Sequence, residues 1–112
     1  MTMNIIERFS KVITNVTYPE KNSNWNIAGI LPNSNEYLKF DVRDMFRLED
    51  GNLGKKIKLN QKVDKIVFET NNKWLILDQK EFNKYLLRTK QKIIKLDDLI
   101  NSLDWTKIIL KE

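Results

Sequence analysis

The spacing of apolar and polar positions predicts a helix at the start of the chain and a strand soon after it. Apolar side chains recur at helical intervals in residues 4–16, NIIERFSKVITNV, and polar side chains fall on the opposite side. Pro19 and the polar run around it end this helix. The next apolar stretch is residues 25–31, WNIAGIL, which predicts a first strand.

Strict two-residue alternation marks a second strand at residues 36–42, EYLKFDV. One set of positions, Leu38, Phe40 and Val42, is apolar and is expected to face the core. The other set should point outward as a row on the opposite face of the strand: Tyr37, Lys39, Asp41 and Arg43.

The middle of the chain predicts an irregular segment followed by a hairpin. Residues 43–56, RDMFRLEDGNLGKK, contain two glycines and are predicted to form a loop, and residues 56–60, KIKLN, are compatible with a short strand. Residues 64–70, DKIVFET, and 73–78, KWLILD, are strands in this interpretation. The asparagines at 71 and 72 tolerate positive φ, as a two-residue hairpin turn requires.

A helix is predicted directly after the second hairpin strand. Asp78 and Glu81 have the spacing of a capping box, and residues 79–90, QKEFNKYLLRTK, carry an apolar stripe at helical intervals. The following run at 92–96, KIIKL, is predicted to be extended.

The C-terminal residues predict a short helix and a closing strand. Asp97 or Asp98 begins the helix in DDLINSLDW, and residues 105–110, WTKIIL, form a final strand or an extended tail. The predicted class is therefore α+β, with an N-terminal helix, a mostly antiparallel sheet of four to five strands, two short C-terminal helices and a terminal strand. Its length of 112 residues predicts one domain over residues 1–112.

Composition restricts the chemistry that is open to this chain. It contains no cysteine and no histidine, so thiolate nucleophiles, soft metal ligands and the commonest general base are all missing. The N-terminus has scattered charges in place of a signal peptide, and no apolar run reaches the length of a membrane span. We therefore expect a cytoplasmic protein without enzymatic activity, cofactor or membrane association.

The net charge of +5 raises the alternative of a small nucleic-acid-binding protein. Residues 55–95 hold twelve basic and four acidic side chains, whereas the two flanking segments are slightly acidic. However, sixteen of the twenty basic residues are lysine, and the guanidinium group of arginine is the better partner for phosphates and bases. Solvated surface lysines are the simpler interpretation.

A second alternative is a magnesium-dependent nuclease of the PD-(D/E)xK type. Asp64 and the triplet Asp78-Gln79-Lys80 offer two carboxylates for Mg²⁺ and a lysine that could position water. Two features weaken this alternative. Asp78 stands where a helix N-cap is needed, and neither proline nor glutamate flanks Asp64 in the usual way.

Each tryptophan adjoins apolar residues at the edge of a predicted strand, which predicts core packing for Trp25, Trp74 and Trp105. Stacking on single-stranded bases is the alternative, and it would require these rings to be exposed.

Aromatic, arginine and acidic residues gather in the middle of the chain, the mixture typical of protein interfaces. The candidate partner-binding residues are Tyr37, Lys39, Asp41, Arg43, Asp44, Phe46, Arg47, Glu49 and Asp50. A solvated face with alternating charges is the alternative explanation of the same pattern.

Residues 64–105 resemble segments of immunity proteins from contact-dependent growth inhibition systems and similar toxin-immunity modules. The resemblance lies in the order KIVFE, a short turn, KWLILD, a helix, KIIKLDDLI and a terminal LDW. It implies a small cytoplasmic protein that binds and neutralises the C-terminal toxin domain of a cognate effector, commonly an RNase or DNase.

Inhibitors of basic nucleases are often acidic, whereas this chain is basic overall. The resemblance therefore implies a local acidic binding face. Its first candidate is the acidic group Asp41, Asp44, Glu49 and Asp50, and the second is Asp97, Asp98 and Asp104.

Overall fold

The computed structural model describes residues 4–20, 24–43, 46–47, 53–54, 63–88 and 96–111, with the backbone alone at 46, 47, 53, 54, 96 and 97. The helices in these ranges are α1 (Ile5–Ser10), α2 (Gln79–Arg88) and α3 (Leu96–Asn101). The strands are β1 (Thr14–Thr17), β2 (Ile27–Ile30), β3 (Tyr37–Arg43), β4 (Phe46–Arg47), β5 (Leu53–Gly54), β6 (Lys65–Glu69), β7 (Lys73–Asp78) and β8 (Thr106–Leu110).

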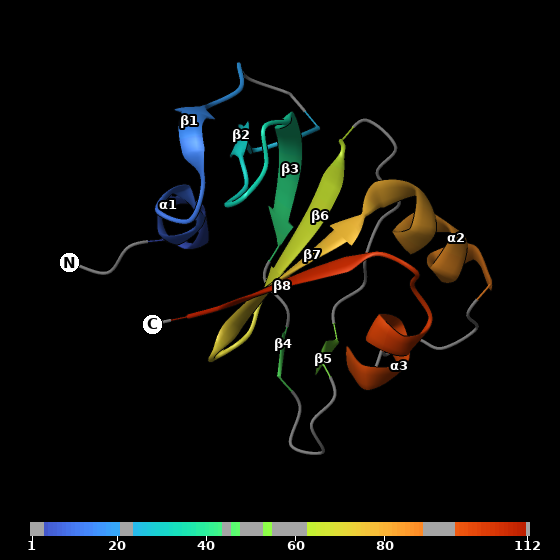
Figure 1. Ribbon diagram of the computed structural model, residues 1–112. Helices are drawn as coiled ribbons and strands as arrows, with labels where there is room; N and C mark the ends of the chain where they lie inside the picture. Colours follow the sequence, from blue (N-terminus) through green and yellow to red (C-terminus); the bar gives the residue numbers. More distant parts are fainter. Residues whose placement is uncertain are drawn as a thin grey trace.

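Six of these strands form one twisted sheet in the order β1-β2-β3-β6-β7-β8 (Figure 1). Every neighbouring pair is antiparallel except β3 and β6, which run parallel. A parallel pair needs a long connection, and the β4-β5 pair lies within it. The predicted α+β class and the mostly antiparallel sheet are confirmed, but the described sheet has more strands than expected.

The helices cover both faces of the sheet. Alternation along β7 sends Trp74 and Ile76 to the face covered by α1, and Leu75 and Leu77 to the face covered by α2 and α3. The core is therefore split into two clusters, one on each side of the central strands. Strands buried on both faces need apolar side chains at consecutive positions, which explains the continuous runs in β6 and β7.

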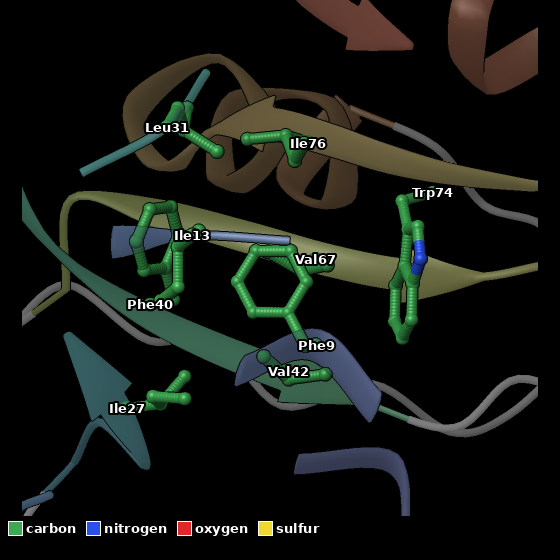
Figure 2. Packing of buried hydrophobic residues seen from close by; sticks show 9 residues of the cluster. All are labelled: Phe9, Ile13, Ile27, Leu31, Phe40, Val42, Val67, Trp74 and Ile76. Carbon is green, nitrogen blue, oxygen red and sulfur yellow. The ribbon is translucent and has the colours of Figure 1, made fainter. Parts of the chain in front are cut away.

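The cluster beneath α1 centres on Phe9. Figure 2 shows this ring between Phe40 and Trp74, and each of the two ring centroids lies 5.2 Å from that of Phe9. Phe9 is fully buried. Phe9 is the buried residue of this six-residue helix, and the partly buried Ile5 and Ile6 pack against the same cluster.

The N-terminal helix is shorter than its apolar spacing predicts. Asn4 caps it by accepting the Glu7 N–H at 2.8 Å, but the helix ends at Ser10, and residues 14–16 of the predicted helix belong to β1. Residues 12–17 are rich in β-branched side chains, which fit a strand better than a helix. Pairing with β2 therefore outweighs the helical spacing.

The β6-β7 hairpin forms where it is predicted, but its turn differs. The Lys73 N–H donates to the Thr70 hydroxyl at 3.1 Å, and the Thr70 N–H donates to the Lys73 carbonyl at 2.9 Å. Neither Asn71 nor Asn72 has positive φ, whereas Asn15 and Asn33 do. The threonine side chain closes the turn. The prediction that the two asparagines of the turn adopt positive φ is therefore wrong.

The capping box before α2 forms only in part. Asp78 Oδ2 accepts the Glu81 N–H at 3.3 Å, as predicted for an N-cap. The Glu81 carboxylate turns away and accepts the N–H groups of Asp104 and Trp105 at 2.8 and 3.0 Å. It thereby ties α2 to the segment between α3 and β8.

The remaining C-terminal predictions hold with small shifts. α3 begins at Leu96, one residue before the predicted opening aspartates, and β8 follows as predicted. The predicted short strand at 56–60 and most of the predicted extended run at 92–96 lie outside the described residues.

An ion cluster joins α1 to the far ends of β6 and β8. The Glu69 carboxylate accepts hydrogen bonds from Arg8 Nη2 and Lys111 Nζ, each at 2.8 Å, and its side chain is 13% exposed. Burial raises the pKa of Glu69, but the hydrogen bonds and charges of Arg8 and Lys111 outweigh burial and hold it below the ordinary value of 4.5. The cluster therefore stays charged at neutral pH.

Candidate binding face

Strand β3 carries the outward row that its sequence predicts. Phe40 and Val42 enter the cluster beneath α1, so Tyr37, Lys39, Asp41 and Arg43 lie on the opposite face of the strand. Tyr37 is 50% exposed and Lys39 is also exposed. Asp41 and Arg43 are half-buried. The row therefore has an exposed end at Tyr37 and a less exposed, charged end at Arg43.

Hydrogen bonds on both sides fix the backbone of β3. Asn26 extends the pairing with β2, because its side-chain Nδ2 donates to the Val42 carbonyl at 2.9 Å and its Oδ1 accepts the Val42 N–H at 3.0 Å. On the β6 side, Asp64 Oδ2 accepts the Lys39 N–H at 2.8 Å. Nothing in the sequence singles out Asn26, since an asparagine before a strand forms no distinctive pattern.

Trp25 adds an aromatic ring to the exposed end of the row. The ammonium group of Lys39 lies 5.5 Å from the centroid of this ring, at cation–π distance. Trp25 is half-buried and packs against the α2-side cluster, so the predicted core packing is only partly confirmed for it. The contact holds Lys39 beside an aromatic surface.

Asp41 and Arg43 form an ion pair along the strand. Arg43 Nη2 and Nε both lie 2.8 Å from Asp41 Oδ2. The side chain of Asp41 is 13% exposed and that of Arg43 is 18% exposed. Residues two apart on a strand share a face, which explains the contact. Of the first acidic group, Asp41 is thus matched by a positive charge.

The rest of the predicted binding set cannot be placed as side chains. Asp44, Glu49 and Asp50 lie outside the described residues. Phe46 and Arg47 form β4, which follows β3 closely along the chain and pairs with β5. Only the backbone of these two residues is described. Their part in binding stays a prediction.

The second acidic group is spread over α3 and the segment that follows it. Asp98 is exposed, and Asp104 borders an open groove of about 550 Å³ together with Glu81, Lys84 and Arg88. Basic and acidic side chains alternate around this groove, so it has no single sign of charge. The side chain of Asp97 lies outside the described residues.

Trp105 departs from the core packing predicted for it. It is 38% exposed, and Lys65 Nζ lies 3.7 Å from its ring centroid. Trp74, in contrast, is buried as predicted. Nothing in the local pattern separates these two residues, because the difference arises from their places in the fold: Trp74 belongs to the internal strand β7, whereas Trp105 directly precedes the edge strand β8.

The carboxylates of the nuclease alternative take part in the fold itself. Asp64 accepts the Lys39 N–H, and Asp78 caps α2 while its Oδ1 lies 3.3 Å from Lys65 Nζ. Lys80 is exposed on the first turn of α2. Within the described ranges, no three Asp, Glu, His or Cys side chains gather closely enough to hold a metal ion.

Replacing Asp78 with alanine should lower the free energy of unfolding by about 1 kcal/mol, because α2 loses its N-cap. Asp78→Asn keeps an oxygen acceptor at this position and should stay within about 0.5 kcal/mol of the natural protein. Urea unfolding followed by circular dichroism measures both values. Equal stability of the alanine variant and the natural protein would contradict the capping role. A metal-binding role instead predicts that both variants lose a Mg²⁺-dependent cleavage activity.

Comparisons with known proteins found no match, so a function has to be argued from the fold and the geometry of the candidate site. No protein-family model matches the chain, and no curated protein or solved structure shows significant similarity to it. Among the helices that the structure describes, none is both long enough and apolar enough to cross a membrane.

Proposed function

We propose that this chain is an immunity protein that neutralises a cognate toxin domain by binding it, with the outward row of β3 in the interface. One observation carries the proposal: β3 presents exposed Tyr37 and Lys39 from a paired strand. Tyr37 pairs with Ile30 of β2, and the backbone of Lys39 is held on both sides. A rigid strand pays little conformational entropy on binding, so an aromatic side chain that it displays contributes more to affinity.

The composition of this face also favours a protein partner. Tyrosine, tryptophan and arginine are enriched in interface hot spots, and Tyr37, Trp25 and Arg43 all lie on or beside the row. The Asp41–Arg43 pair adds polar groups at the sheltered end. Such a face would act by covering the active site of the toxin or its substrate surface.

Binding is favoured over catalysis by the state of the candidate carboxylates. Asp64 and Asp78 each accept a hydrogen bond from a backbone N–H group. The bond to Asp64 links β3 to the start of β6, and the bond to Asp78 caps the N-terminus of α2. A general base or metal ligand needs free acceptor capacity directed at a substrate site. At least one oxygen of each carboxylate is engaged in the fold, which gives both residues a structural role.

Tyr37→Ala should weaken binding of the toxin domain by about tenfold or more, as expected for an aromatic residue that anchors an interface. Tyr18, which is 58% exposed beyond the end of β1, provides the matched control, and Tyr18→Ala should change affinity by about twofold at most. Titration with a catalytically inactive toxin domain measures both variants. Equal effects of the two substitutions would exclude the β3 row as the interface.

Nucleic-acid binding is the second candidate function, and one observation favours it. Lys80, Lys84 and Arg88 are four residues apart along α2 and all are exposed, so they form one basic stripe. Titration with duplex and single-stranded DNA and RNA at several salt concentrations tests this stripe. Affinity that falls steeply with salt, and that falls again in Lys84→Glu, would support it over the immunity function.

A further inference from the structure

β8 is the last strand of the sheet, and its outer edge is regular. It pairs with β7 without interruption from Thr106 to Leu110, and no strand in the described ranges pairs with its other side. Its apolar side chains are open to solvent: Ile108 is 46% exposed and Leu110 is 73% exposed. Such an edge is a template for one more strand.

The pairing with β7 settles which backbone groups of β8 face outward. The Lys111 N–H donates to the Asn72 carbonyl at 2.9 Å, so residues 107, 109 and 111 direct their backbone groups toward β7. Those of Thr106, Ile108 and Leu110 therefore point to the open edge. Three evenly spaced N–H and C=O pairs are available there for an added strand.

The opposite edge of the sheet is built differently. Between Thr14 and Thr17 the pairing of β1 with β2 shifts, and Asn15 has φ of 55°. An irregularity of this kind bends an edge strand and blocks further pairing. β8 has no such irregularity, so the two edges of the sheet differ in their capacity to bind another strand.

The two faces of β8 differ in chemistry. Ile108 lies opposite Leu75 on the α2 side of the sheet, and Leu110 follows it opposite Lys73. The exposed side chains that β8 itself presents on this side are apolar. On the α1 side lies a groove of about 520 Å³ whose lining includes Arg8, Lys11, Trp74, Ile109 and Lys111. Glu69 also lines it, and this single carboxylate is shared by Arg8 and Lys111.

Positive charge dominates the α1 side of the edge. Lys11 is exposed and has no ion-pair partner within the described residues, and Lys107 also lies on this side, where its ammonium group donates to the Pro32 carbonyl at 2.6 Å. A second copy of the chain would bring its own lysines and its net charge of +5 to this edge. Charge complementarity therefore favours an acidic partner over self-association.

We propose that β8 binds an extended segment of another protein, in which acidic side chains alternate with apolar ones. The added strand pairs with the outward backbone groups of Thr106, Ile108 and Leu110. Its apolar side chains lie beside Ile108 and Leu110, and its acidic side chains lie over the cationic groove next to α1. This site stands apart from the β3 row and does not depend on the partner being a toxin.

A designed hairpin peptide tests this proposal directly. Its outer strand alternates Glu and Val, and a second hairpin with Lys in place of Glu serves as the charge control. Titration of the ¹⁵N-labelled protein, with amide hydrogen exchange, should show that the Glu hairpin protects the amides of Thr106, Ile108 and Leu110. The Lys hairpin should bind about tenfold more weakly or not at all.

Variants of the protein separate edge pairing from other modes of binding. Leu110→Pro removes an outward N–H without touching the pairs with β7, and it should weaken binding of the Glu hairpin by about tenfold. Leu110→Val keeps this N–H and should bind normally. Lys11→Glu should weaken binding of the Glu hairpin and strengthen binding of the Lys hairpin. This variant tests the role of charge without introducing a proline into β8.

Three results would overturn the proposal. The first is that the Glu hairpin leaves the β8 amides unchanged, and the second is that both hairpins bind equally well. The third is that the protein itself protects its β8 amides in a concentration-dependent way, since the occupant would then be a second copy. None of these results bears on toxin binding by the β3 row, which is measured with a different ligand and different variants.

Discussion

Phe9→Ala is expected to lower the free energy of unfolding by about 3–5 kcal/mol, the largest effect of any substitution considered. The Phe9 side chain is fully buried and packs its ring against Phe40 and Trp74. Alanine would leave a cavity that the sheet cannot close, because its backbone is fixed by pairing. It would also remove the main apolar contact of α1, which has only six residues and cannot persist alone.

Chemical unfolding monitored by tryptophan fluorescence measures this loss, since Trp74 lies in the same cluster. Phe9→Leu is the matched control: it keeps most of the buried volume and should cost clearly less than the alanine variant. A loss below about 1 kcal/mol for Phe9→Ala would mean that α1 does not dock on the sheet as described.

Gly29→Ala is expected to destabilise the protein by about 2–3 kcal/mol, although alanine is ordinarily no worse than glycine in a strand. A Cβ at position 29 would lie 2.7 Å from Ile13 Cδ1 and 2.7 Å from the Thr14 carbonyl oxygen. The oxygen belongs to the backbone of the paired strand β1, so it cannot move aside without shifting that strand. Close approach, and no special backbone angle, is what requires glycine here.

The double variant Gly29→Ala with Ile13→Val provides a test of this cause. It removes the Cδ1 atom from the crowded contact and should recover part of the loss caused by Gly29→Ala, while the clash with Thr14 remains. Thermal unfolding compares Gly29→Ala, Ile13→Val and the double variant with the natural protein. A Gly29→Ala protein that is as stable as the natural one would show that β1 and β2 are less closely packed than described.

Local patterns predict β2, β3 and β6 to β8, because burial on one or both faces leaves a direct mark on the sequence, whereas β4 and β5 lie in a segment predicted to be a loop. The alternation in β3 and the apolar runs of β6 and β7 come from this cause. The segment after Ser10 misleads for a related reason. Its apolar positions fit helical spacing, whereas its β-branched side chains and its pairing with β2 select a strand.

Some features of the candidate site follow from local sequence patterns, and others depend on which strands are neighbours in the sheet. The facing of Tyr37 and Lys39 follows from alternation within one strand, so the sequence alone predicts it. The contacts of Lys39 with Asp64 and Trp25 depend on which strands are neighbours, and no local pattern encodes that order. The exposed edge of β8 is hidden from sequence analysis for the same reason, since TKIIL has the composition of a buried strand.

The capping role of Asp78 also bears on the choice between functions. A short Asp-x-Lys pattern arises wherever an aspartate caps a helix that has a lysine in its first turn, as at Asp78 and Lys80. The pattern therefore carries little information about catalysis without a site around it. Immunity binding and nucleic-acid binding remain the two functions that specific surface features favour.

Calorimetric titration against an inactivated C-terminal domain of the polypeptide encoded immediately upstream of this gene is the most direct test of the proposed function. We expect one-to-one binding with a dissociation constant in the nanomolar range or tighter, of the order of −12 kcal/mol at 1 nM. The affinity should survive moderate salt, since much of it would come from buried aromatic contacts. Absence of binding to this domain, together with salt-sensitive binding to nucleic acid, would contradict the immunity function and favour the basic stripe of α2.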